Sequence, residues 1–319
     1  MQALIKERQC DIIVVGGTLE GCVAAIAAAK RGSRVMLLEK GGSLGGMASN
    51  GLCAWLDAPA ASDSDVAEIR AELLKRLGLD DSPAGVVYPD QQMKVVLGEW
   101  LRDAGVTFLT HVFVSEPIRD GERIVGFTAN GKTEPFRITA GRALDATDIM
   151  ETAGMAGLEV IETSGTVSSA VKLNSFDARR IPLLDGREVA GGKLGRLDVS
   201  FDGCFGGLRF RCERPRAILP TGTGELLLSD LVCEVADCDA LTLSSALMGM
   251  RRFAYALRDH LREETEGMAD VNVIHVAPRL NAYGARRVSE PPRALSLLNN
   301  DGRAYSNSAA LEKGVAALR

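Results

Sequence analysis

The sequence predicts an α/β fold that begins with a parallel sheet and continues into a β-rich region. An apolar run over residues 12–15 ends at a pair of glycines, an alanine-rich stretch with helical spacing follows, and a second apolar run over residues 35–38 ends at Glu39. Continuous apolar runs are typical of strands that are buried on both faces. The order strand, tight turn, helix, strand predicts a βαβ unit over residues 10–40. Between residues 158 and 235, glycine and proline separate short apolar runs, which indicates a β-rich region.

The other elements follow from the spacing of apolar residues and from the residues that flank them. Apolar side chains three and four positions apart predict helices, and capping residues and glycines predict where helices begin and end. Asn130–Gly131 predicts a hairpin between two strands. The predicted helices lie near residues 64–78, 90–105, 149–156, 242–264 and 306–318, and the predicted strands lie at 106–114, 122–129, 134–138, 142–146, 158–162, 197–201, 208–212, 225–232 and 271–277.

The turn between the first strand and the first helix has the features of a dinucleotide site. Gly16 permits a sharp turn, Gly21 permits close packing of the helix on the sheet, and the helix N-terminus offers N–H groups to a pyrophosphate. Glu39 ends the second strand about 20 residues later, where a carboxylate accepts hydrogen bonds from a ribose and disfavours a 2′-phosphate. The alternative is a βαβ unit that binds no ligand.

Thr18 departs from the glycine pattern of such turns, because it occupies the position of the middle glycine in G-x-G-x-x-G. That glycine normally lets the backbone approach the pyrophosphate closely. Two roles for Thr18 are open at this point: it hydrogen-bonds the phosphate, or it holds the phosphate away.

The segment that follows Glu39 reads KGGSLGGMASNGL. It resembles the loop that follows the ribose-binding acid in FAD-dependent oxidoreductases of the glutathione-reductase-like, two-dinucleotide-fold group, where small residues let the loop run beside the pyrophosphate toward the flavin. The resemblance implies a Rossmann-like FAD-binding domain over residues 1–157, an inserted β-rich (α+β) substrate domain over 158–280, and a return segment toward the FAD domain over 281–319. The matching residues are Gly45, Gly46, Met47, Ala48, Ser49 and Gly51.

The resemblance also implies which residues contact FAD. A strand end touches the adenine through its backbone at the position of Val114, and a short strand after residue 142 brings Thr147 to the pyrophosphate. The family's glycine is replaced there by Asp148, whose carboxylate repels a pyrophosphate unless it faces away or meets a cation. No metal site is predicted. The predicted FAD contacts are Gly16, Gly17, Thr18, Gly21, Glu39, Lys40, Gly45, Gly46, Met47, Val114 and Thr147.

On the substrate side, no residue stands out as a general base. The family's R-E-S-R-R-like stretch has its counterpart at residues 283–287, where the last two arginines match, so Arg286 and Arg287 are candidate catalytic residues together with His275. Trp55 either lines a substrate pocket or packs on a helix. A dense group of arginines indicates either an anionic substrate or the exposed positions of a hairpin; these are Arg209, Arg211, Arg214 and Arg216.

The C-terminal part contains no second glycine-rich turn. In the family, a further segment returns to the first domain and presents a helix N-terminus to the flavin. We therefore expect the FAD-closing segment to be absent from this chain, and the resulting hypothesis is that a partner subunit completes the flavin site. The alternatives are a shortened enzyme that closes its site differently and a truncated chain.

Together, these patterns predict an FAD-dependent oxidoreductase, or the FAD-binding subunit of a heteromeric one, that oxidises a small organic substrate by hydride transfer to flavin N5. The alternatives are a non-catalytic dinucleotide-binding scaffold subunit and an NAD-dependent dehydrogenase. A net charge of −5 argues against nucleic-acid binding, and no apolar run is long enough to cross a membrane. Seven scattered cysteines without a C-x-x-C pair predict a cytoplasmic protein.

Overall fold

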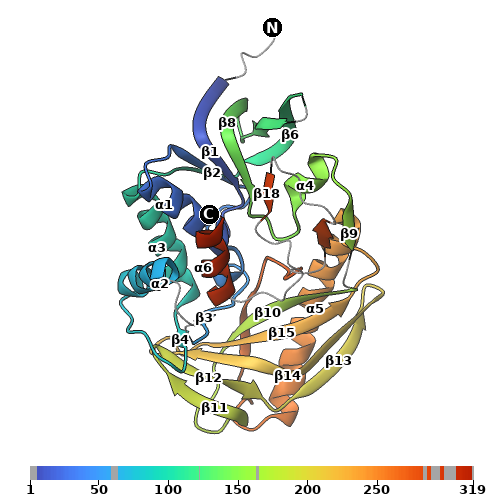
Figure 1. Cartoon of the computed structure of the whole chain (residues 1–319). Coiled ribbons are helices and arrows are strands. Elements are labelled where there is room, and N and C mark those ends of the chain that lie inside the picture. Colours follow the sequence, from blue (N-terminus) through green and yellow to red (C-terminus); the bar gives the residue numbers. More distant parts are fainter. Residues whose placement is uncertain are drawn as a thin grey trace.

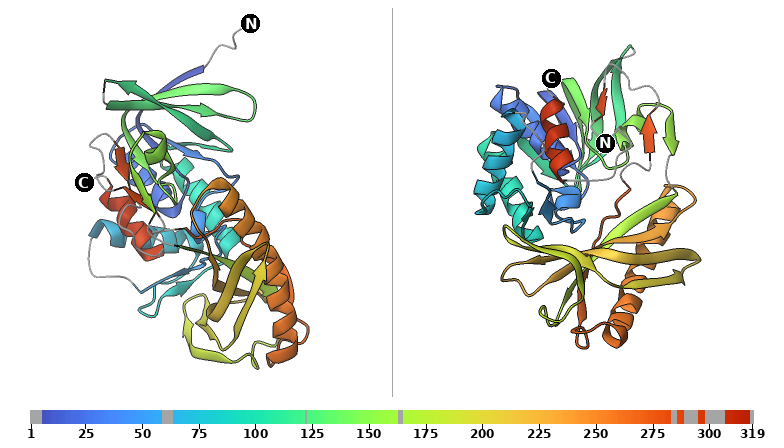
Figure 2. Two further views of the ribbon diagram at one scale, coloured as in Figure 1. Left: turned by 90° about the vertical axis from the view of Figure 1, so that its right-hand side faces the viewer. Right: turned by 60° about the horizontal axis from the view of Figure 1, so that its bottom comes forward.

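The computed structural model of the protein describes residues 6–58, 64–121, 123–162, 165–282, 286–288, 295–297 and 307–317. Two large sheets lie one above the other in Figure 1, and each has helices packed against it. The two views of Figure 2 show the same separation, with one long helix against the second sheet. The α/β class is therefore confirmed, while the domain boundaries at residues 157 and 280 stay a prediction.

The first sheet has the strand order β5-β2-β1-β8-β7-β6, and β18 lies beside β8. Strand β1 runs parallel to both β2 and β8, so that Val15 lies opposite Leu38 on one side and Asp145 on the other. The carboxyl ends of three strands therefore meet at one edge of the sheet. The strands are β1 (Lys6–Val15), β2 (Val35–Glu39), β5 (Thr107–Thr110), β6 (Phe113–Asp120), β7 (Arg123–Asn130), β8 (Pro135–Asp145) and β18 (Leu295–Leu297).

Alternate residues of β1 pack into two different cores, as the period of a strand requires. Ile12 and Val14 join the helices on one face, while Ile13 and Val15 join side chains of β6 and β7 on the other. This explains the continuous apolar run in the sequence. The helices on the first face are α1 (Leu19–Lys30), α2 (Ser64–Leu77), α3 (Asp90–Asp103) and α6 (Asn307–Ala316); the short elements nearby are η1 (Gly46–Ala48), β3 (Trp55–Leu56), β4 (Val86–Val87) and α4 (Glu151–Met155).

The predicted βαβ unit and the hairpin at Asn130–Gly131 are confirmed. Three parts of the strand prediction are wrong, and one of them is the strand predicted at 197–201, which is interrupted at Asp198 and Val199. The predicted strand over residues 106–114 is broken at His111, which has a left-handed backbone with φ of 55°. The break occurs because β5 follows β2 only as far as Glu39, after which the chain turns to pair β6 with β7. The two strands predicted at 134–138 and 142–146 are one strand, β8, whose partner on one side changes from β7 to β18 along its length.

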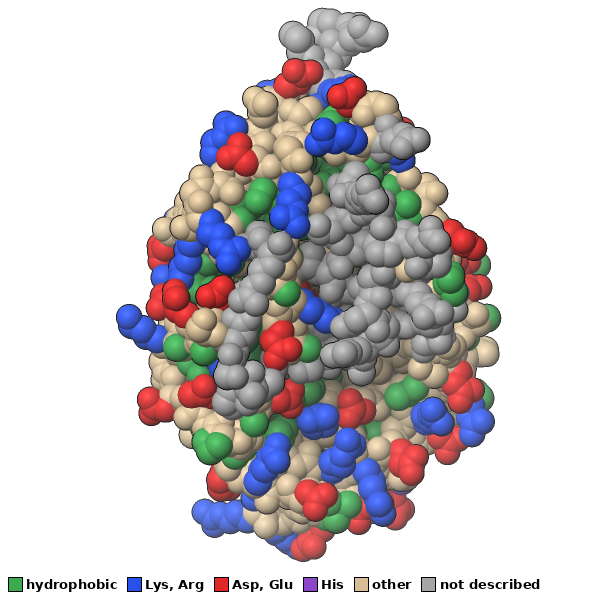
Figure 3. Space-filling view, viewed as in Figure 1, with side chains coloured by type: hydrophobic (Ala, Val, Ile, Leu, Met, Phe, Trp, Pro, Cys, Tyr) green, Lys and Arg blue, Asp and Glu red, His purple; other side chains and the backbone are tan. Residues whose placement is uncertain are grey.

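The second sheet has the order β11-β12-β14-β15-β10-β16, with β13 paired to β14. Helix α5 (Ala240–Glu264) covers one face, and the other face packs toward the first sheet's helices. Figure 3 shows basic and acidic side chains mixed over this part of the molecule, in the lower half of the view. The strands are β10 (Thr166–Asn174), β11 (Leu183–Val189), β12 (Gly192–Leu197), β13 (Ser200–Phe205), β14 (Leu208–Pro220), β15 (Leu226–Glu234) and β16 (Asn272–Val276).

Strands β10, β11 and β12 were not predicted from the sequence. Most residues of β11 are exposed or half-buried, because it lies at the edge of the sheet, so the strand lacks an apolar alternation.

The longest described helix, α5, is amphipathic. Within the described ranges, no helix combines the length and apolar character that a membrane crossing requires.

Two elements near the C-terminus lie against the first sheet and its helices, within the range 281–319 that was predicted as a return segment. Strand β18 pairs in parallel with the carboxyl end of β8, and α6 packs along α1, where Gly314 meets Val23. At the start of α6, the Asn307 side-chain amide donates to the backbone oxygens of Cys53, at 2.6 Å, and Trp55. The absence of the family's FAD-closing segment stays a prediction. A further two-stranded sheet pairs β9 (Val160–Glu162) with β17 (Arg286–Val288).

Candidate cofactor and active site

The turn from β1 into α1 admits only glycine at two positions. Gly16 has φ of +106°, and a Cβ there would lie 2.6 Å from the Ala146 oxygen. A Cβ on Gly21 would lie 2.1 Å from the oxygen of Gly16. Both glycines therefore hold the helix N-terminus against the end of β8, where its N–H groups face outward from the sheet's carboxyl edge.

Thr18 caps α1. Its side chain is fully buried, its hydroxyl accepts a hydrogen bond from the Gly21 N–H at 3.2 Å, and it donates to the Ala146 oxygen at 2.9 Å. The hydroxyl is therefore engaged within the protein. The two roles left open by the sequence, contact with a phosphate and obstruction of it, stay predictions.

Glu39 is almost fully buried and organises the loop around the ribose position. Its carboxylate accepts the Gly17 N–H at 2.7 Å and the Gly41 N–H at 2.6 Å. A carboxylate has about four acceptor positions, so capacity remains for ribose hydroxyls. The glycine turn and the loop after β2 are thus tied together by the acid that the sequence predicted as the ribose ligand.

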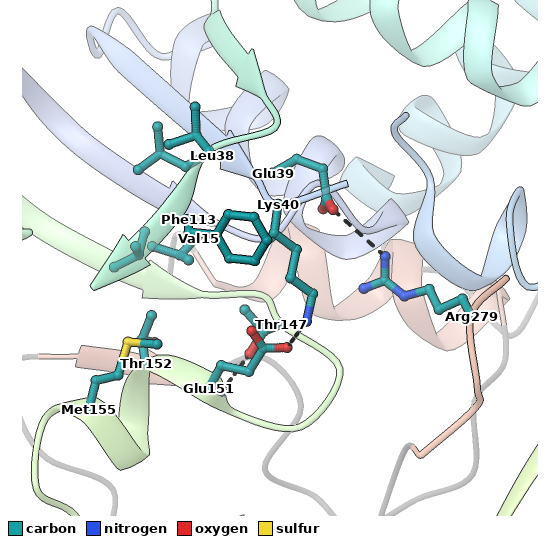
Figure 4. Close-up of a pocket in the computed structure, with 13 residues that line it drawn as sticks. Val15, Leu38, Glu39, Lys40, Phe113, Thr147, Glu151, Thr152, Met155 and Arg279 are labelled. Atoms are coloured by element: carbon teal, nitrogen blue, oxygen red, sulfur yellow. Dashed lines mark hydrogen bonds and ion pairs between the residues drawn. The ribbon is translucent and has the colours of Figure 1, made fainter. Parts of the chain in front are cut away.

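A cavity of about 50 Å³ lies at the carboxyl edge of the first sheet and opens into one of about 480 Å³. Both are lined by Glu39, Lys40, Glu151 and Arg279. The smaller cavity has an apolar wall formed by Val15, Leu38, Val112, Phe113, Val114 and Met155, with Gly16 and Thr147 beside it (Figure 4). The larger is lined by Gly41, Gly42, Asn50, Asp148, Ile149, Leu243, Ser244, Leu247, Pro278, Leu280 and Ala282. We call the two cavities together the cofactor cleft.

Opposite charges meet across the cofactor cleft. Figure 4 shows Arg279 pointing toward Glu39, at 4.0 Å, and Lys40 pointing toward Glu151, with which it forms an ion pair. Arg279 also forms an ion pair with Asp148. The carboxylate that the sequence placed beside the pyrophosphate therefore does meet a cation. Its second oxygen, Oδ1, is buried without a hydrogen-bond partner among the described residues.

The loop after β8 is fixed by a buried carboxylate. Asp145 accepts the Thr147 N–H at 2.8 Å and the Thr147 hydroxyl at 2.6 Å, and it also accepts the Thr152 hydroxyl. Burial raises the pKa of Asp145, against the effect of these hydrogen bonds. The Thr147 hydroxyl accepts the Glu151 N–H at 2.7 Å, so Thr147 lines the cleft as part of a rigid turn.

The loop containing Gly45, Gly46 and Met47 lies directly against the glycine turn. Gly45 has φ of +98°, and its N–H donates to the Gly17 oxygen at 2.7 Å. A Cβ on Gly46 would lie 3.2 Å from Thr18. Met47 is buried. The structure thus brings together the predicted cofactor residues before Asn50, although these three do not line the cofactor cleft.

A family model described as FAD dependent oxidoreductase matches residues 11–173, just over half of the 319-residue chain. The chain belongs to the FAD-dependent oxidoreductase family. FAD is accordingly its cofactor, and the residues present fit it: the turn at Gly16 leaves helix N–H groups for a pyrophosphate, and Glu39 retains acceptor capacity for a ribose.

Solved structures of other flavoenzymes share the fold of this FAD-dependent oxidoreductase at low sequence identity. One is p-nitrophenol 4-monooxygenase PnpA from Pseudomonas putida DLL-E4 (14% identity, TM-score 0.61, covering 98% of this chain and 79% of that one). Another is the myxobacterial chondrochloren halogenase CndH (16% identity, TM-score 0.59, covering 98% of this chain and 73% of that one). A third is a geranylgeranyl bacteriochlorophyll reductase-like protein from Thermoplasma acidophilum (14% identity, TM-score 0.59, covering 98% of this chain and 78% of that one). No curated protein matches the sequence.

The predicted catalytic residues of this FAD-dependent oxidoreductase lie on separate sheets. His275 is in β16 opposite Lys172 of β10, and burial together with the charges of Lys172 and Lys94 lowers its pKa. Arg286 and Arg287 are in β17, which pairs with β9. Their side chains, like residues 283–285 of the substrate-side motif, lie outside what the structure describes. His275 does not line the cofactor cleft.

Sequence reasoning missed Arg279, Glu151 and the pair Gly41–Gly42, all of which line the cofactor cleft. One signal concerned Asp148, which replaces a glycine: its carboxylate was expected either to face away from the pyrophosphate or to meet a cation. It did not reveal which of the chain's arginines would supply the charge. Arg279 directly follows β16 of the second sheet, and only the packing of the two sheets brings it to Asp148.

Proposed function

We propose that this chain holds FAD in the cofactor cleft and oxidises a small organic substrate by hydride transfer to the flavin. The adenine lies against the apolar wall at Val114, the ribose binds Glu39, and the pyrophosphate meets the α1 N-terminus. From there the cofactor continues toward Gly45, Gly46 and Met47. When bound, FAD supplies the hydride acceptor at its N5; the protein supplies position and charge.

The observation that carries the proposal is the continuity of the cleft. It begins at the carboxyl edge of the first sheet, where dinucleotides bind in α/β folds, and it extends to α5 of the second sheet. Leu243 and Leu247 of α5 line its far side. A cofactor that spans both parts is shielded from water by the same apolar side chains that enclose its substrate.

Charge balance in the cleft favours a dianionic pyrophosphate only because Arg279 is present. Without it, the buried carboxylate of Glu39 and the half-buried carboxylate of Asp148 would both face the phosphate. Oδ1 of Asp148 offers an acceptor to a hydroxyl of the cofactor. The arginine is thus a positioning residue for the cofactor.

We also infer that the chain belongs to the glutathione-reductase-like branch of its family, a proposal supported by the Gly45–Gly46–Met47 loop. The hypothesis that a partner subunit completes the flavin site stays a prediction; β18 and α6, which lie against the first sheet and α1, support a site built from this chain alone. We propose that the chain binds FAD through its own residues and acts in the cytoplasm.

The test is a visible absorption spectrum of the purified chain after incubation with FAD, followed by anaerobic addition of small organic substrates. We expect a flavin band with one FAD per chain and bleaching by at least one substrate. Glu39→Ala should lower FAD occupancy, while Glu68→Ala, an exposed change on α2, should not. A colourless protein would overturn FAD binding by the isolated chain. A yellow protein that no substrate bleaches, and that turns over only with oxygen and an added reductant, would overturn hydride transfer from substrate.

A further inference from the structure

We propose that Arg216, stacked on Trp55 between the two sheets, binds a carboxylate group of the substrate. This inference rests on the proposed function, because it assigns the class of substrate that the flavin would oxidise, although neither Arg216 nor Trp55 lines the cofactor cleft itself. It concerns a side chain for which the sequence offered two interpretations, an anion ligand and an exposed hairpin position.

Arg216 lies on the face of the second sheet that packs toward the FAD-binding part. A bulge between Cys212 and Arg216 changes the register of β14 against β15. Beyond it, Ala217 packs beneath α5, whereas Ile218 packs in the core shared with the first sheet's helices. Since strand residues alternate, Arg216 shares the face of Ile218. The contact with Trp55 of β3 agrees with this orientation.

The guanidinium of Arg216 contacts Trp55 but forms no ion pair among the described residues. Its Cζ atom lies 4.4 Å from the centre of the Trp55 ring, and its Nε is buried without a hydrogen-bond partner. Among the described residues, no acid forms an ion pair with it. The neighbouring arginines differ: Arg196 pairs with Asp230 at 3.7 Å and Arg214 with Asp198 at 3.3 Å. Arg216 is half-buried, and its Nε–H is a donor that no described residue accepts. An anion is the ligand that such a donor fits.

Trp55 holds the guanidinium of Arg216 from one side. Trp55 is 6% exposed, and its indole N–H donates to Asp57 at 3.2 Å, which holds the ring in place. A cation at 4.4 Å from the centre of the ring is attracted to the ring's face. A guanidinium offers pairs of parallel N–H groups that match the two oxygens of a carboxylate, which is why we assign a carboxylate and not a neutral polar group.

The site lies beside the loop assigned to the cofactor. The Cys53 N–H donates to the Met47 oxygen at 3.0 Å, and Asn307 of α6 binds the backbone oxygens of Cys53 and Trp55. Trp55 is therefore joined to the Gly45–Met47 loop within a few residues. Across the sheet, Arg216 lies opposite Ser229 of β15 on one side and opposite Arg196 of β12 on the other; Arg196 itself pairs with Asp230. A carboxylate bound here would hold a substrate beside the Gly45–Met47 loop.

The experiment uses benzoate as the carboxylate probe and benzamide as its uncharged counterpart. Each is titrated into the protein with and without FAD, and binding is read from the flavin spectrum and from tryptophan fluorescence. We expect benzoate to bind the wild type and Arg214→Gln, an exposed control on the same strand, and benzamide to bind at least tenfold more weakly. Arg216→Gln should weaken benzoate binding at least tenfold, and Arg216→Lys should restore part of it.

Two results would overturn the proposal: benzoate binding Arg216→Gln as tightly as the wild type, or none of benzoate, acetate and succinate binding the wild type. Thermal unfolding of Arg216→Lys and Arg216→Gln checks that both variants are folded. The fluorescence titration without FAD separates the two proposals, because benzoate binding can fail while FAD binds, and can persist while FAD does not.

Discussion

The Thr18 hydroxyl stabilises the fold through the two hydrogen bonds that cap α1. Thr18→Val keeps the shape of the side chain but leaves the Gly21 N–H and the Ala146 oxygen without this partner. We expect a loss of about 1–2 kcal/mol in the free energy of unfolding, measured by urea denaturation. Thr18→Ser should retain most of the stability. If Thr18→Val is as stable as the wild type but loses FAD, the hydroxyl contacts phosphate instead.

Arg279 and Asp148 act as a pair, so their substitutions should not be additive. Arg279→Ala leaves Asp148 and Glu39 facing the cofactor without compensation, and we expect roughly tenfold weaker FAD binding or more. The double variant Arg279→Ala/Asp148→Asn should recover much of the loss. FAD fluorescence quenching measures both affinities. A double variant as weak as Arg279→Ala would indicate direct contact between Arg279 and the cofactor.

His275 should make stability depend on pH. Burial and then the charges of Lys172 and Lys94 lower its pKa below the ordinary 6.5, opposed by Asp90. The unfolded chain therefore binds a proton that the folded chain resists, so the stability falls as pH decreases below about 6.5 and levels off below the folded pKa. Urea denaturation between pH 5 and 7.5 measures the slope, and His275→Asn should reduce it. An equal slope in that variant would assign the effect to another group.

At the scale of elements, α6 depends on close contact with α1. A Cβ on Gly314 would lie 2.7 Å from both the Glu20 oxygen and the Val23 side chain. Gly314→Ala should therefore destabilise the protein by roughly 1–3 kcal/mol, despite alanine's better helix propensity. Gly98→Ala in α3 is the matched control, because nothing lies within 4 Å of its Cβ, and it should stabilise by about 0.5–1 kcal/mol.

Thermal unfolding measures both glycine variants, and an equal gain in stability would mean that α6 does not pack on α1. This contact is also the reason why the packing of α6 on α1 could not be predicted from the sequence. The helix itself was predicted from its alanine-rich composition, but its place against α1 depends on the gap left by Gly314 and on Asn307, which binds residues more than 250 positions away.

At the scale of the whole molecule, a buried ion pair joins the two sheets. Lys172 of β10 lies 2.5 Å from Asp90 of α3 and 3.0 Å from Glu225, and both Lys172 and Asp90 are almost fully buried. Lys172→Met should cost roughly 3–5 kcal/mol, because Asp90 then has no cation in a buried position. Lys172→Met/Asp90→Leu should recover most of the stability in urea denaturation. If the single and double variants lose the same free energy of unfolding, the unpaired Asp90 carboxylate is not the cause of the loss.

The sequence alone determined the βαβ unit, the glycine turn and Glu39 at the end of β2, because these depend on residues that are neighbours in the chain and on the local spacing of apolar side chains. It also indicated that Asp148 either faces away from the pyrophosphate or meets a cation. Strands such as β11, whose side chains are largely exposed, left no comparable pattern.

The tertiary structure decided which distant groups meet. Thr18 reaches Ala146, Arg279 reaches Asp148 and Glu39, and Arg216 reaches Trp55 only because separate elements pack against one another. Such contacts depend on the relative positions of whole sheets and helices, and a local pattern of residue types carries no information about those positions. The cofactor turn could therefore be predicted from the sequence, whereas the charged and aromatic contacts that complete the site could not.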